Sequence, residues 1–193
     1  MGKESMLSKK PMILVIAGPN GSGKTTFTHY FEKVGCYTNA DDIVAATGMS
    51  NEEAARLVDD KRYASIKAKE DFSFETVLSS KYKLDILEKA KAEGYFIKCI
   101  FVLTVDALVN VARVEMRVAS GGHNVDRNKI IERYNKSLAN IKKLMEICDI
   151  LHVYDNTFEP IRIIRKHKED ISIFPNEFWA EERIFELIEE VAD

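Results

Sequence analysis

The chain of 193 residues is 46% hydrophobic, and its 28 Lys and Arg residues against 31 Asp and Glu residues give a net charge of −3. This composition is typical of a globular chain that folds around one core. Binding to nucleic acid depends on attraction between basic side chains and phosphates, so the acidic balance disfavours nucleic acid as a partner. The longest apolar runs, residues 12–17 and 99–105, are shorter than the roughly 20 residues that a membrane-spanning helix needs, so we expect no membrane partner.

The amino terminus predicts a short tail rather than a targeting signal. Residues 1–10 are polar and contain no apolar stretch of the kind that a secretory signal requires. The three cysteines lie far apart in the sequence, as in proteins that are kept reduced. We therefore expect a flexible amino-terminal tail over residues 1–10, a single domain over residues 11–193 and a cytoplasmic location.

Apolar runs and helical periodicity alternate along the chain. The first run is continuous and rich in branched side chains, which is typical of a strand buried on both faces. Strands are predicted over residues 12–17, 36–39, 72–78, 95–105, 150–154 and 161–165. Helices are predicted over residues 25–34, 51–71, 83–93, 107–119 and 127–148, with a last helix from about residue 177. This alternation indicates an α/β fold with a three-layer open parallel sheet and helices on both faces.

A glycine-rich turn joins the first strand to the first helix and fits the template G-x-x-x-x-G-K-[ST]. Glycines let successive backbone N–H groups curl around phosphate oxygens. Lys24 can supply a positive charge to the outer phosphates, and the Thr25 hydroxyl can hold Mg²⁺. The alternative is a turn that only connects two elements. The predicted binding residues for ATP or GTP are Gly18, Pro19, Asn20, Gly21, Ser22, Gly23, Lys24, Thr25 and Thr26.

Carboxylates follow or lie within three of the predicted strands. Asp41 and Asp42 come after the second strand, at the sheet edge that carries the glycine-rich turn, where ligands of such sheets bind. A carboxylate there can accept the proton of an attacking hydroxyl, although Asp in this position is also a common turn residue or helix cap. Glu75 lies in an otherwise aromatic strand and needs a partner, either substrate or a salt bridge. Asp106 is interpreted as a helix cap in preference to a metal ligand.

Two arginines mark a predicted helical lid. Arg113 and Arg117 are four residues apart and share a helix face, where their guanidinium groups can grip triphosphate oxygens. Exposed helices also carry such pairs without a function. The break Gly121-Gly122-His123 that follows favours a closing lid over about residues 113–127. His123 by itself is more typical of a surface loop than of a functional residue.

Taken together, these segments resemble the zeta-toxin family of P-loop kinases, in particular its small stand-alone members. The glycine-rich turn is generic, whereas the combination of segments is specific to the family. The matching stretches keep the family's order from about residue 11 to residue 156: the turn at 18–26, NADD at 39–42, FETVLS at 74–79, RVEMR at 113–117, GGH at 121–123, RY at 133–134, SL at 137–138 and YDN at 154–156.

The resemblance implies a cytosolic P-loop kinase that transfers the γ-phosphate of ATP or GTP to a hydroxyl of a nucleotide sugar such as UDP-N-acetylglucosamine. It also implies an antitoxin protein as a partner. Residue by residue, it implies that the base is Asp41, the phosphate lysine Lys24, the Mg²⁺ ligand Thr25, the substrate-contacting pair Glu75 and Thr76, and the catalytic arginine Arg113. The predicted catalytic residues are Lys24, Asp41, Arg113 and Arg117, and the predicted substrate-binding residues are Asp42, Glu75, Thr76 and His123.

The chain departs from the family where typical members carry a second lid arginine. Gly121-Gly122-His123 occupies that region, and Arg117 or Arg127 is the candidate substitute. Two alternative functions stay open at this point: a P-loop kinase acting on a nucleoside or other metabolite, and a nucleotide-gated regulatory ATPase that makes no phosphorylated product. Phe178 and Trp179 are interpreted as core residues of the last helix in preference to a partner surface.

Overall fold

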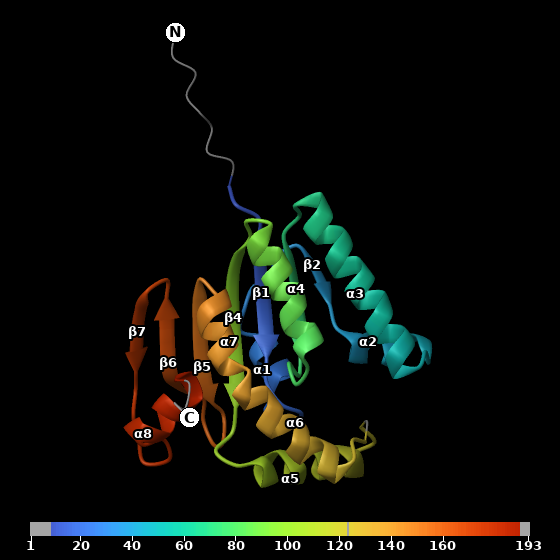
Figure 1. Cartoon of the computed structure of the whole chain (residues 1–193). Coiled ribbons are helices and arrows are strands. Elements are labelled where there is room, and N and C mark those ends of the chain that lie inside the picture. Colours follow the sequence, from blue (N-terminus) through green and yellow to red (C-terminus); the bar gives the residue numbers. More distant parts are fainter. Residues whose placement is uncertain (1–8, 123, 190–193) are drawn as a thin grey trace.

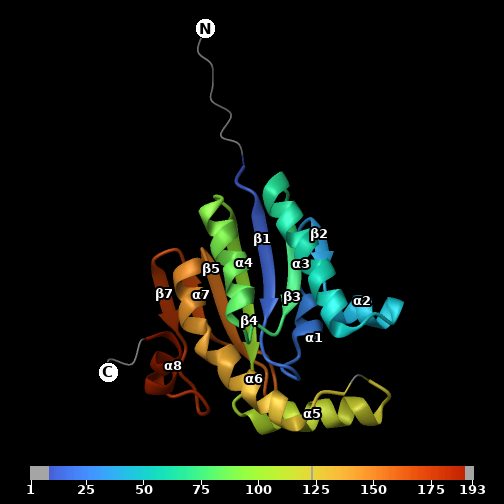
Figure 2. The same ribbon diagram turned by 45° about the vertical axis from the view of Figure 1, so that its right-hand side comes forward.

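A seven-stranded sheet with the order β2-β3-β1-β4-β5-β6-β7 forms the centre of the protein. The computed structural model describes residues 9–122 and 124–189. Figures 1 and 2 show the sheet from two directions, with the helices packed around it. The strands are β1 (Met12–Ala17), β2 (Cys36–Thr38), β3 (Phe72–Thr76), β4 (Phe96–Leu103), β5 (Ile150–Asp155), β6 (Ile161–His167) and β7 (Asp170–Ile173).

The first five strands are parallel, as the alternating pattern predicts. β1 lies at the centre, between β3 and β4, and each of its residues is paired on at least one side. Its residues Ile13 to Ala17 are almost completely buried, which explains why the run is continuously apolar. Because all five strands run in the same direction, their carboxyl ends meet at one edge of the sheet. The glycine-rich turn leaves the sheet at this edge.

The prediction of an entirely parallel sheet is wrong for the last two strands. β6 pairs antiparallel with β5, and β7, which the sequence analysis did not predict, pairs antiparallel with β6. The physical reason is the length of the connections. Only five residues, 156–160, join β5 to β6, and two residues join β6 to β7. A parallel return needs a dozen or more residues, so short connections force antiparallel pairing.

The helices agree with the predictions in order and differ at several boundaries. They are α1 (Lys24–Thr28), α2 (Ala40–Thr47), α3 (Asn51–Ala68), α4 (Lys81–Ala92), α5 (Ala107–Ala119), α6 (Arg127–Ala139), α7 (Ile141–Ile147) and α8 (Glu181–Ile188). α1 is much shorter than predicted, and α2 was not predicted. The single helix predicted over 127–148 is divided at Asn140, whose side chain donates to the Leu78 carbonyl at 2.8 Å. Asp106 caps α5, as expected, by accepting from Leu108 N.

Helices lie on both faces of the sheet, but the coverage is unequal. The main core lies between the sheet and helices α3, α4, α7 and α8. On the opposite face, Phe27 of α1 packs with Leu14 and Ile16 in a much smaller cluster. The apolar residues Phe31 and Val34 reach this cluster from the non-helical segment after α1.

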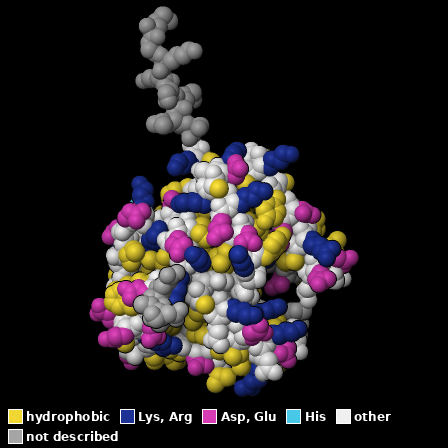
Figure 3. Space-filling view, in the orientation of Figure 1, with side chains coloured by type: hydrophobic (Ala, Val, Ile, Leu, Met, Phe, Trp, Pro, Cys, Tyr) yellow, Lys and Arg dark blue, Asp and Glu magenta, His cyan; other side chains and the backbone are white. Residues whose placement is uncertain are grey.

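The surface mixes charges of both signs. Figure 3 shows lysine and arginine side chains interspersed with aspartate and glutamate over the face that carries α3, α4 and α7. Within residues 9–122 and 124–189, no helix combines the length and apolar character that a membrane crossing requires.

The packing of α4 gives a direct test of this core. Leu87 on α4 is fully buried in the main cluster. We expect Leu87→Ala to lower the free energy of unfolding by about 2–5 kcal/mol, because the substitution removes buried methyl groups and leaves a cavity. Urea denaturation measures this change. The neighbouring Glu88 is exposed, so Glu88→Ala should stay within about 0.5 kcal/mol of the native chain. Equal effects of the two substitutions would contradict the placement of α4.

Candidate active site

The glycine-rich turn, residues 18–25, follows β1 and will be called the phosphate loop. Its backbone takes conformations that favour glycine, and Gly18 and Gly23 show this best. Gly18 has φ +142° and Gly23 has φ +92°. A Cβ atom on Gly18 would clash with the Val102 carbonyl, and one on Gly23 would clash with the Asn156 side chain. The glycines therefore allow both the tight turn and the close approach of neighbouring strand ends.

Lys24 begins α1 and is almost completely buried. Its Nζ donates to the Pro19 carbonyl at 3.0 Å, so the side chain folds back over the phosphate loop. Burial is the largest influence on this group and lowers the pKa of Lys24 from its ordinary value, while the negative charges of Glu75 and Asp41 act in the opposite direction. Arg117 lowers the same pKa further. These interactions bring four sequence-predicted residues into one electrostatic cluster.

Two asparagines that are distant in sequence, one on α5 and one directly after β5, hold the phosphate loop in place. Asn110 on α5 donates through Nδ2 to the Asn20 carbonyl at 2.6 Å. Asn156, directly after β5, donates through Nδ2 to the Ser22 carbonyl at 2.8 Å. The amide oxygen of Asn110 also accepts from Thr104 Oγ1. The loop is therefore shaped by side chains that join it to β4, α5 and β5.

Glu75 lies near the carboxyl end of β3 and faces the phosphate loop. Its Oε1 accepts from Thr25 Oγ1 at 3.2 Å, and its Oε2 accepts from Thr28 Oγ1 at 3.0 Å and from the Tyr37 hydroxyl at 3.5 Å. Burial and the nearby Glu75 carboxylate raise the pKa of Tyr37, so its hydroxyl stays protonated. Glu75 thus bonds three hydroxyl groups, and within the described part of the chain it forms no salt bridge.

Asp41 and Asp42 lie in the first turn of α2 rather than in a loop. Asn39 is the N-cap of this helix: its Oδ1 accepts from Asp41 N at 3.1 Å, and its Nδ2 donates to Asp42 Oδ1 at 3.3 Å. The helix cap therefore belongs to Asn39, which leaves the Asp41 side chain exposed in the cleft. Asp42 is not among the residues that line the cleft.

The arginines on α5 and α6 lie over the phosphate loop. Arg113 donates through Nη2 to the carbonyls of Asn156 and Thr157, each at 2.8 Å. Arg117 is exposed at the cleft, and Arg133 on α6 donates to Asn20 Oδ1 at 3.4 Å. Residues 113–119 form the second half of α5, residues 120–122 and 124–126 lie in the connection to α6, and Arg127 begins α6. Their closing motion stays a prediction, and His123 lies outside the described residues.

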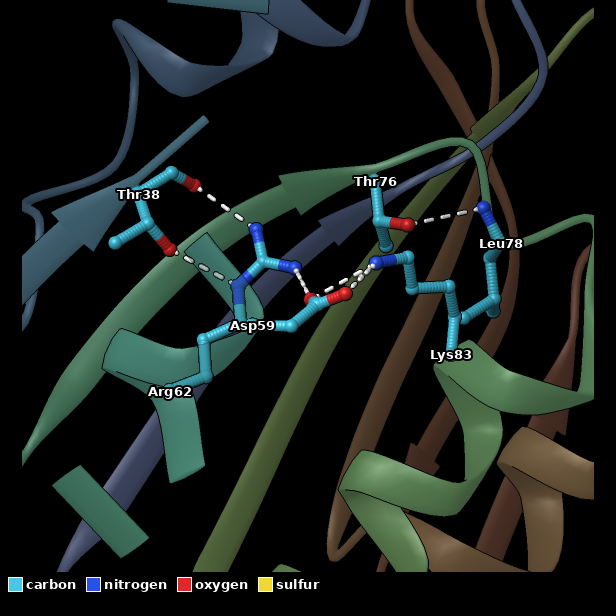
Figure 4. Close-up of polar contacts among 6 residues, drawn as sticks. All are labelled: Thr38, Asp59, Arg62, Thr76, Leu78 and Lys83. Atoms are coloured by element: carbon cyan, nitrogen blue, oxygen red, sulfur yellow. Dashed lines mark hydrogen bonds and ion pairs between the residues drawn. The ribbon is translucent and has the colours of Figure 1, made fainter. Parts of the chain in front are cut away.

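A buried charge network forms the other wall of the cleft (Figure 4). Arg62 on α3 donates to Asp59 at 2.9 Å and to the side chain and carbonyl of Thr38 at 3.0 and 3.3 Å. Lys83 on α4 donates to both Asp59 oxygens, at 2.8 and 2.6 Å. Two cations thus share one carboxylate. Burial lowers the pKa of both Arg62 and Lys83, and Asp59 opposes this effect.

These elements enclose one cleft of about 710 Å³. Thr76 lies in its wall, where its Oγ1 accepts from Leu78 N at 3.1 Å. Eleven of the predicted residues line the cleft together, namely Asn20, Gly21, Gly23, Lys24, Thr25, Thr26, Asp41, Glu75, Thr76, Arg113 and Arg117. Gly18, Pro19 and Ser22 belong to the loop beneath it.

Sequence reasoning missed several residues of this cleft as functional candidates. Asn110, Asn156 and Arg133 hold or face the phosphate loop, and Arg62 and Lys83 line the opposite wall. A polar side chain directly after a strand was the available signal for Asn156. Charged residues on helices, such as the pair on α3 and α4, have no such signal because solvated helices carry them routinely.

Most of the chain matches one known protein family. The family model described as "Zeta toxin" matches residues 37–177. The chain belongs to the zeta toxin family. The matched region contains the Asp41, Glu75 and Arg113 segments on which the resemblance rests, and it begins after the phosphate loop. The resemblance noted in the sequence is therefore confirmed at the level of the family.

A known relative and two solved structures are similar to the chain at low sequence identity. An uncharacterized protein of Haemophilus influenzae is 26% identical over 123 residues, which is 61% of this chain and 88% of that protein. A structure from the PezAT toxin-antitoxin system of Streptococcus pneumoniae has a TM-score of 0.56 at 16% identity, covering 80% of this chain and 71% of that one. The AvrRxo1-ORF1:AvrRxo1-ORF2 structure with sulphate ions gives 0.68 at 14% identity, covering 96% and 67%. These structures confirm the α/β fold of the chain.

The burial of Lys24 should make the folded chain less stable than a chain with an apolar side chain at this position. Because the pKa of Lys24 is lowered on folding, its charged form is less favourable in the folded chain than in the unfolded chain. We expect Lys24→Met to raise the free energy of unfolding at pH 7, by about 1 kcal/mol. Just below pH 10.5 the unfolded chain keeps a proton on Lys24 that the folded chain has lost, so the free energy of unfolding of the native chain rises with pH in this range. The difference in this free energy between Lys24→Met and the native chain should therefore be smaller at pH 10 than at pH 7. Urea denaturation at both pH values measures it. A less stable variant at pH 7 would contradict this view.

Proposed function

We propose that the protein is a kinase that transfers the γ-phosphate of ATP or GTP to a hydroxyl of a small acceptor, a nucleotide sugar such as UDP-N-acetylglucosamine. The observation that carries the proposal is the placement of Asp41 in the same cleft as the phosphate loop, close enough to Lys24 to act on its pKa. A carboxylate beside the phosphate-binding lysine is what in-line transfer to an alcohol requires.

Support for a bound triphosphate comes from the phosphate loop itself. Ser22 Oγ is buried and has no hydrogen-bond partner, although buried hydroxyls are normally paired. A phosphate oxygen in the loop would supply that partner. The glycines leave the surrounding backbone uncovered, and Lys24, Arg113 and Arg117 provide cations for the charge that spreads over the transferred group. A structure of AvrRxo1-ORF1:ORF2 with ATP has the same fold, at a TM-score of 0.68.

The residues around Thr25 fit a Mg²⁺ ion. The Thr25 hydroxyl oxygen and a Glu75 carboxylate oxygen are 3.2 Å apart. Mg²⁺ prefers oxygen ligands, of which only one or two usually come from carboxylates. Thr25 would hold the ion, with Glu75 beside it and phosphate oxygens completing the ligands. When bound, Mg²⁺ would neutralise part of the phosphate charge.

Asp41 is proposed as the general base. Its carboxylate would accept the proton of the acceptor hydroxyl while that oxygen forms a bond to the γ-phosphorus, and the bond between this phosphorus and the nucleoside diphosphate breaks. Because Asn39 takes the role of helix cap, the Asp41 side chain need not bond its own helix terminus. Lys24 and the α5 arginines would stabilise the charge on the phosphoryl oxygens.

The opposite wall supports an acceptor that carries a negative charge. The network of Asp59, Arg62 and Lys83 has one positive charge in excess, and both cations line the cleft while Asp59 is buried behind them. Buried charge without a counterion is costly, so an anionic group on the acceptor would stabilise this wall. The Lys83 ammonium has three N–H donors and one carboxylate partner, which leaves it able to bond the acceptor.

A protein partner and a location are part of the same proposal. The PezAT structure comes from a toxin-antitoxin system, and AvrRxo1-ORF1 is found in a complex with ORF2. We propose that an antitoxin protein binds this chain as well. The expected cytoplasmic location agrees with a need for nucleotide triphosphates and stays a prediction.

The acceptor is found by incubating the protein with ATP or GTP, Mg²⁺ and a panel of alcohols that includes nucleotide sugars, nucleosides and simple sugars. Mass spectrometry should detect one acceptor that gains a single phosphoryl group. A phosphorylated nucleoside would show that the protein is a P-loop kinase with a different substrate class. Release of inorganic phosphate at a rate that no acceptor changes would overturn the kinase proposal and favour a regulatory ATPase.

Replacement of the proposed base separates binding from chemistry. Asp41→Asn should keep the affinity for ATP and lower turnover by roughly two orders of magnitude or more, the scale of a lost general base. Isothermal titration calorimetry and the acceptor assay measure the two properties. Asp42→Asn serves as the matched control and should keep most of the turnover, because Asp42 lies one residue away on the same helix turn but does not line the cleft. Near-normal turnover of Asp41→Asn would remove Asp41 from the mechanism.

Replacement of Lys83 tests the charge of the acceptor. Lys83→Met should raise KM for a phosphate-bearing acceptor roughly tenfold, the scale of one charge-assisted hydrogen bond, and leave KM for ATP unchanged. Asp59 keeps its bond to Arg62, so the wall should stay folded. The control is Lys81→Met, an exposed lysine at the start of the same helix. An equal rise in KM for an uncharged acceptor would argue against an anion at this wall.

A further inference from the structure

One short turn holds both an active-site arginine and the phosphate loop. Residues 155–157 lie at the end of β5, where the carbonyls of Asn156 and Thr157 each accept from Arg113 Nη2 at 2.8 Å. The side chain of Asn156 donates to the Ser22 carbonyl at 2.8 Å. A displacement of this turn would therefore move Arg113 and the phosphate loop together.

The turn is held from behind by a buried carboxylate. Asp155 is 3% exposed, and its Oδ1 accepts from the backbone N–H and the hydroxyl of Thr157, at 2.9 and 2.5 Å. Its Oδ2 accepts from Trp179 Nε1 at 3.0 Å. Because these three donors are all neutral, each of the hydrogen bonds matters for keeping the buried carboxylate in place.

The segment around α8 completes the support. Trp179 is 1% exposed, and the Arg183 guanidinium lies over its ring at 4.1 Å. Arg183 donates to the carbonyls of Phe178 and Val105, at 2.9 and 2.6 Å. The N–H of Val105 in turn donates to Thr157 Oγ1 at 2.8 Å. The carboxyl-terminal segment thus reaches the turn by two routes, through Asp155 and through Val105.

We infer that Asp155 and Trp179 are positioning residues of the active site, which act through the 155–157 turn to place Arg113 and the phosphate loop. Neither residue lines the cleft. Trp179 and Arg183 also lie beyond the residues that the family model matches. Without the indole N–H, the buried carboxylate loses one of its three donors and the turn is free to shift. Small displacements of groups that contact the transferred phosphate have large effects on rate.

A double-mutant cycle tests this inference with Trp179→Phe, Arg113→Ala and the two together. Trp179→Phe keeps an aromatic ring in the core and removes only the N–H donor. We expect it to lower kcat about tenfold in the native chain and by a clearly smaller factor in the Arg113→Ala chain, because the part of its effect that passes through Arg113 is then absent. Thermal unfolding followed by circular dichroism establishes that all variants are folded at the assay temperature.

Phe178→Leu is the matched control, since it alters packing in the same segment and leaves the bond to Asp155 in place. Its effect on kcat should be small and equal in both backgrounds, even where its melting temperature falls. Asp155→Asn should lower kcat as Trp179→Phe does. The asparagine amide has one acceptor oxygen where the carboxylate has two, so it cannot accept from all three donors. Additive effects of Trp179→Phe and Arg113→Ala would overturn the inference.

The kcat readout rests on the proposed kinase function, so the same cycle is also measured on the dissociation constant for ATP. Arg113 and the phosphate loop would contact the nucleotide with or without an acceptor. If no acceptor is phosphorylated, the proposed function fails, and coupling between Trp179 and Arg113 in the ATP affinity still supports the positioning role. Additivity in the ATP affinity, in that case, overturns the positioning role as well.

Discussion

The burial of the Lys24 ammonium beside the phosphate loop is the constraint around which this site is built. A buried lysine is unfavourable as a cation, and the structure opposes that cost with negative charges from two separate elements, Glu75 at the end of β3 and Asp41 on α2. The same two carboxylates line the cleft together with residues of the phosphate loop. The arrangement that makes the charge tolerable therefore also places a candidate base and a candidate Mg²⁺ partner in the cleft.

The cleft has different charge patterns on its two sides. Around the phosphate loop, cations and carboxylates alternate, which suits a transferred phosphate and a hydroxyl that must lose a proton. On the α3 and α4 side, Asp59 is shared by Arg62 and Lys83, which leaves a cationic wall. For the proposed acceptor, this separation would place a hydroxyl near Asp41 and an anionic group near Lys83. Such a division supports orientation of the acceptor by charge as well as by shape.

The long polar side chains that bond the backbone of neighbouring strand ends explain how the loops of this site stay rigid. Asn110, Asn156 and Arg113 each bond a carbonyl that no strand or helix would otherwise satisfy. These bonds connect the phosphate loop to β5, and Asp155 and Trp179 continue the connection to the carboxyl-terminal segment. The fold therefore joins the site to residues that are far from it in sequence.

The local sequence determined the features that depend on neighbouring residues: the buried strand Met12–Ala17, the glycine-rich turn after it, and the Asp106 cap of α5. It also indicated the α/β class and the polar residues at strand ends. Tertiary structure alone decided the antiparallel strands β6 and β7, the sharing of Asp59 by two cations, and the bond between Asp155 and Trp179. The physical reason is that a charge on a helix has the same sequence pattern whether it is solvated or buried, and its partner is chosen by strand order and packing.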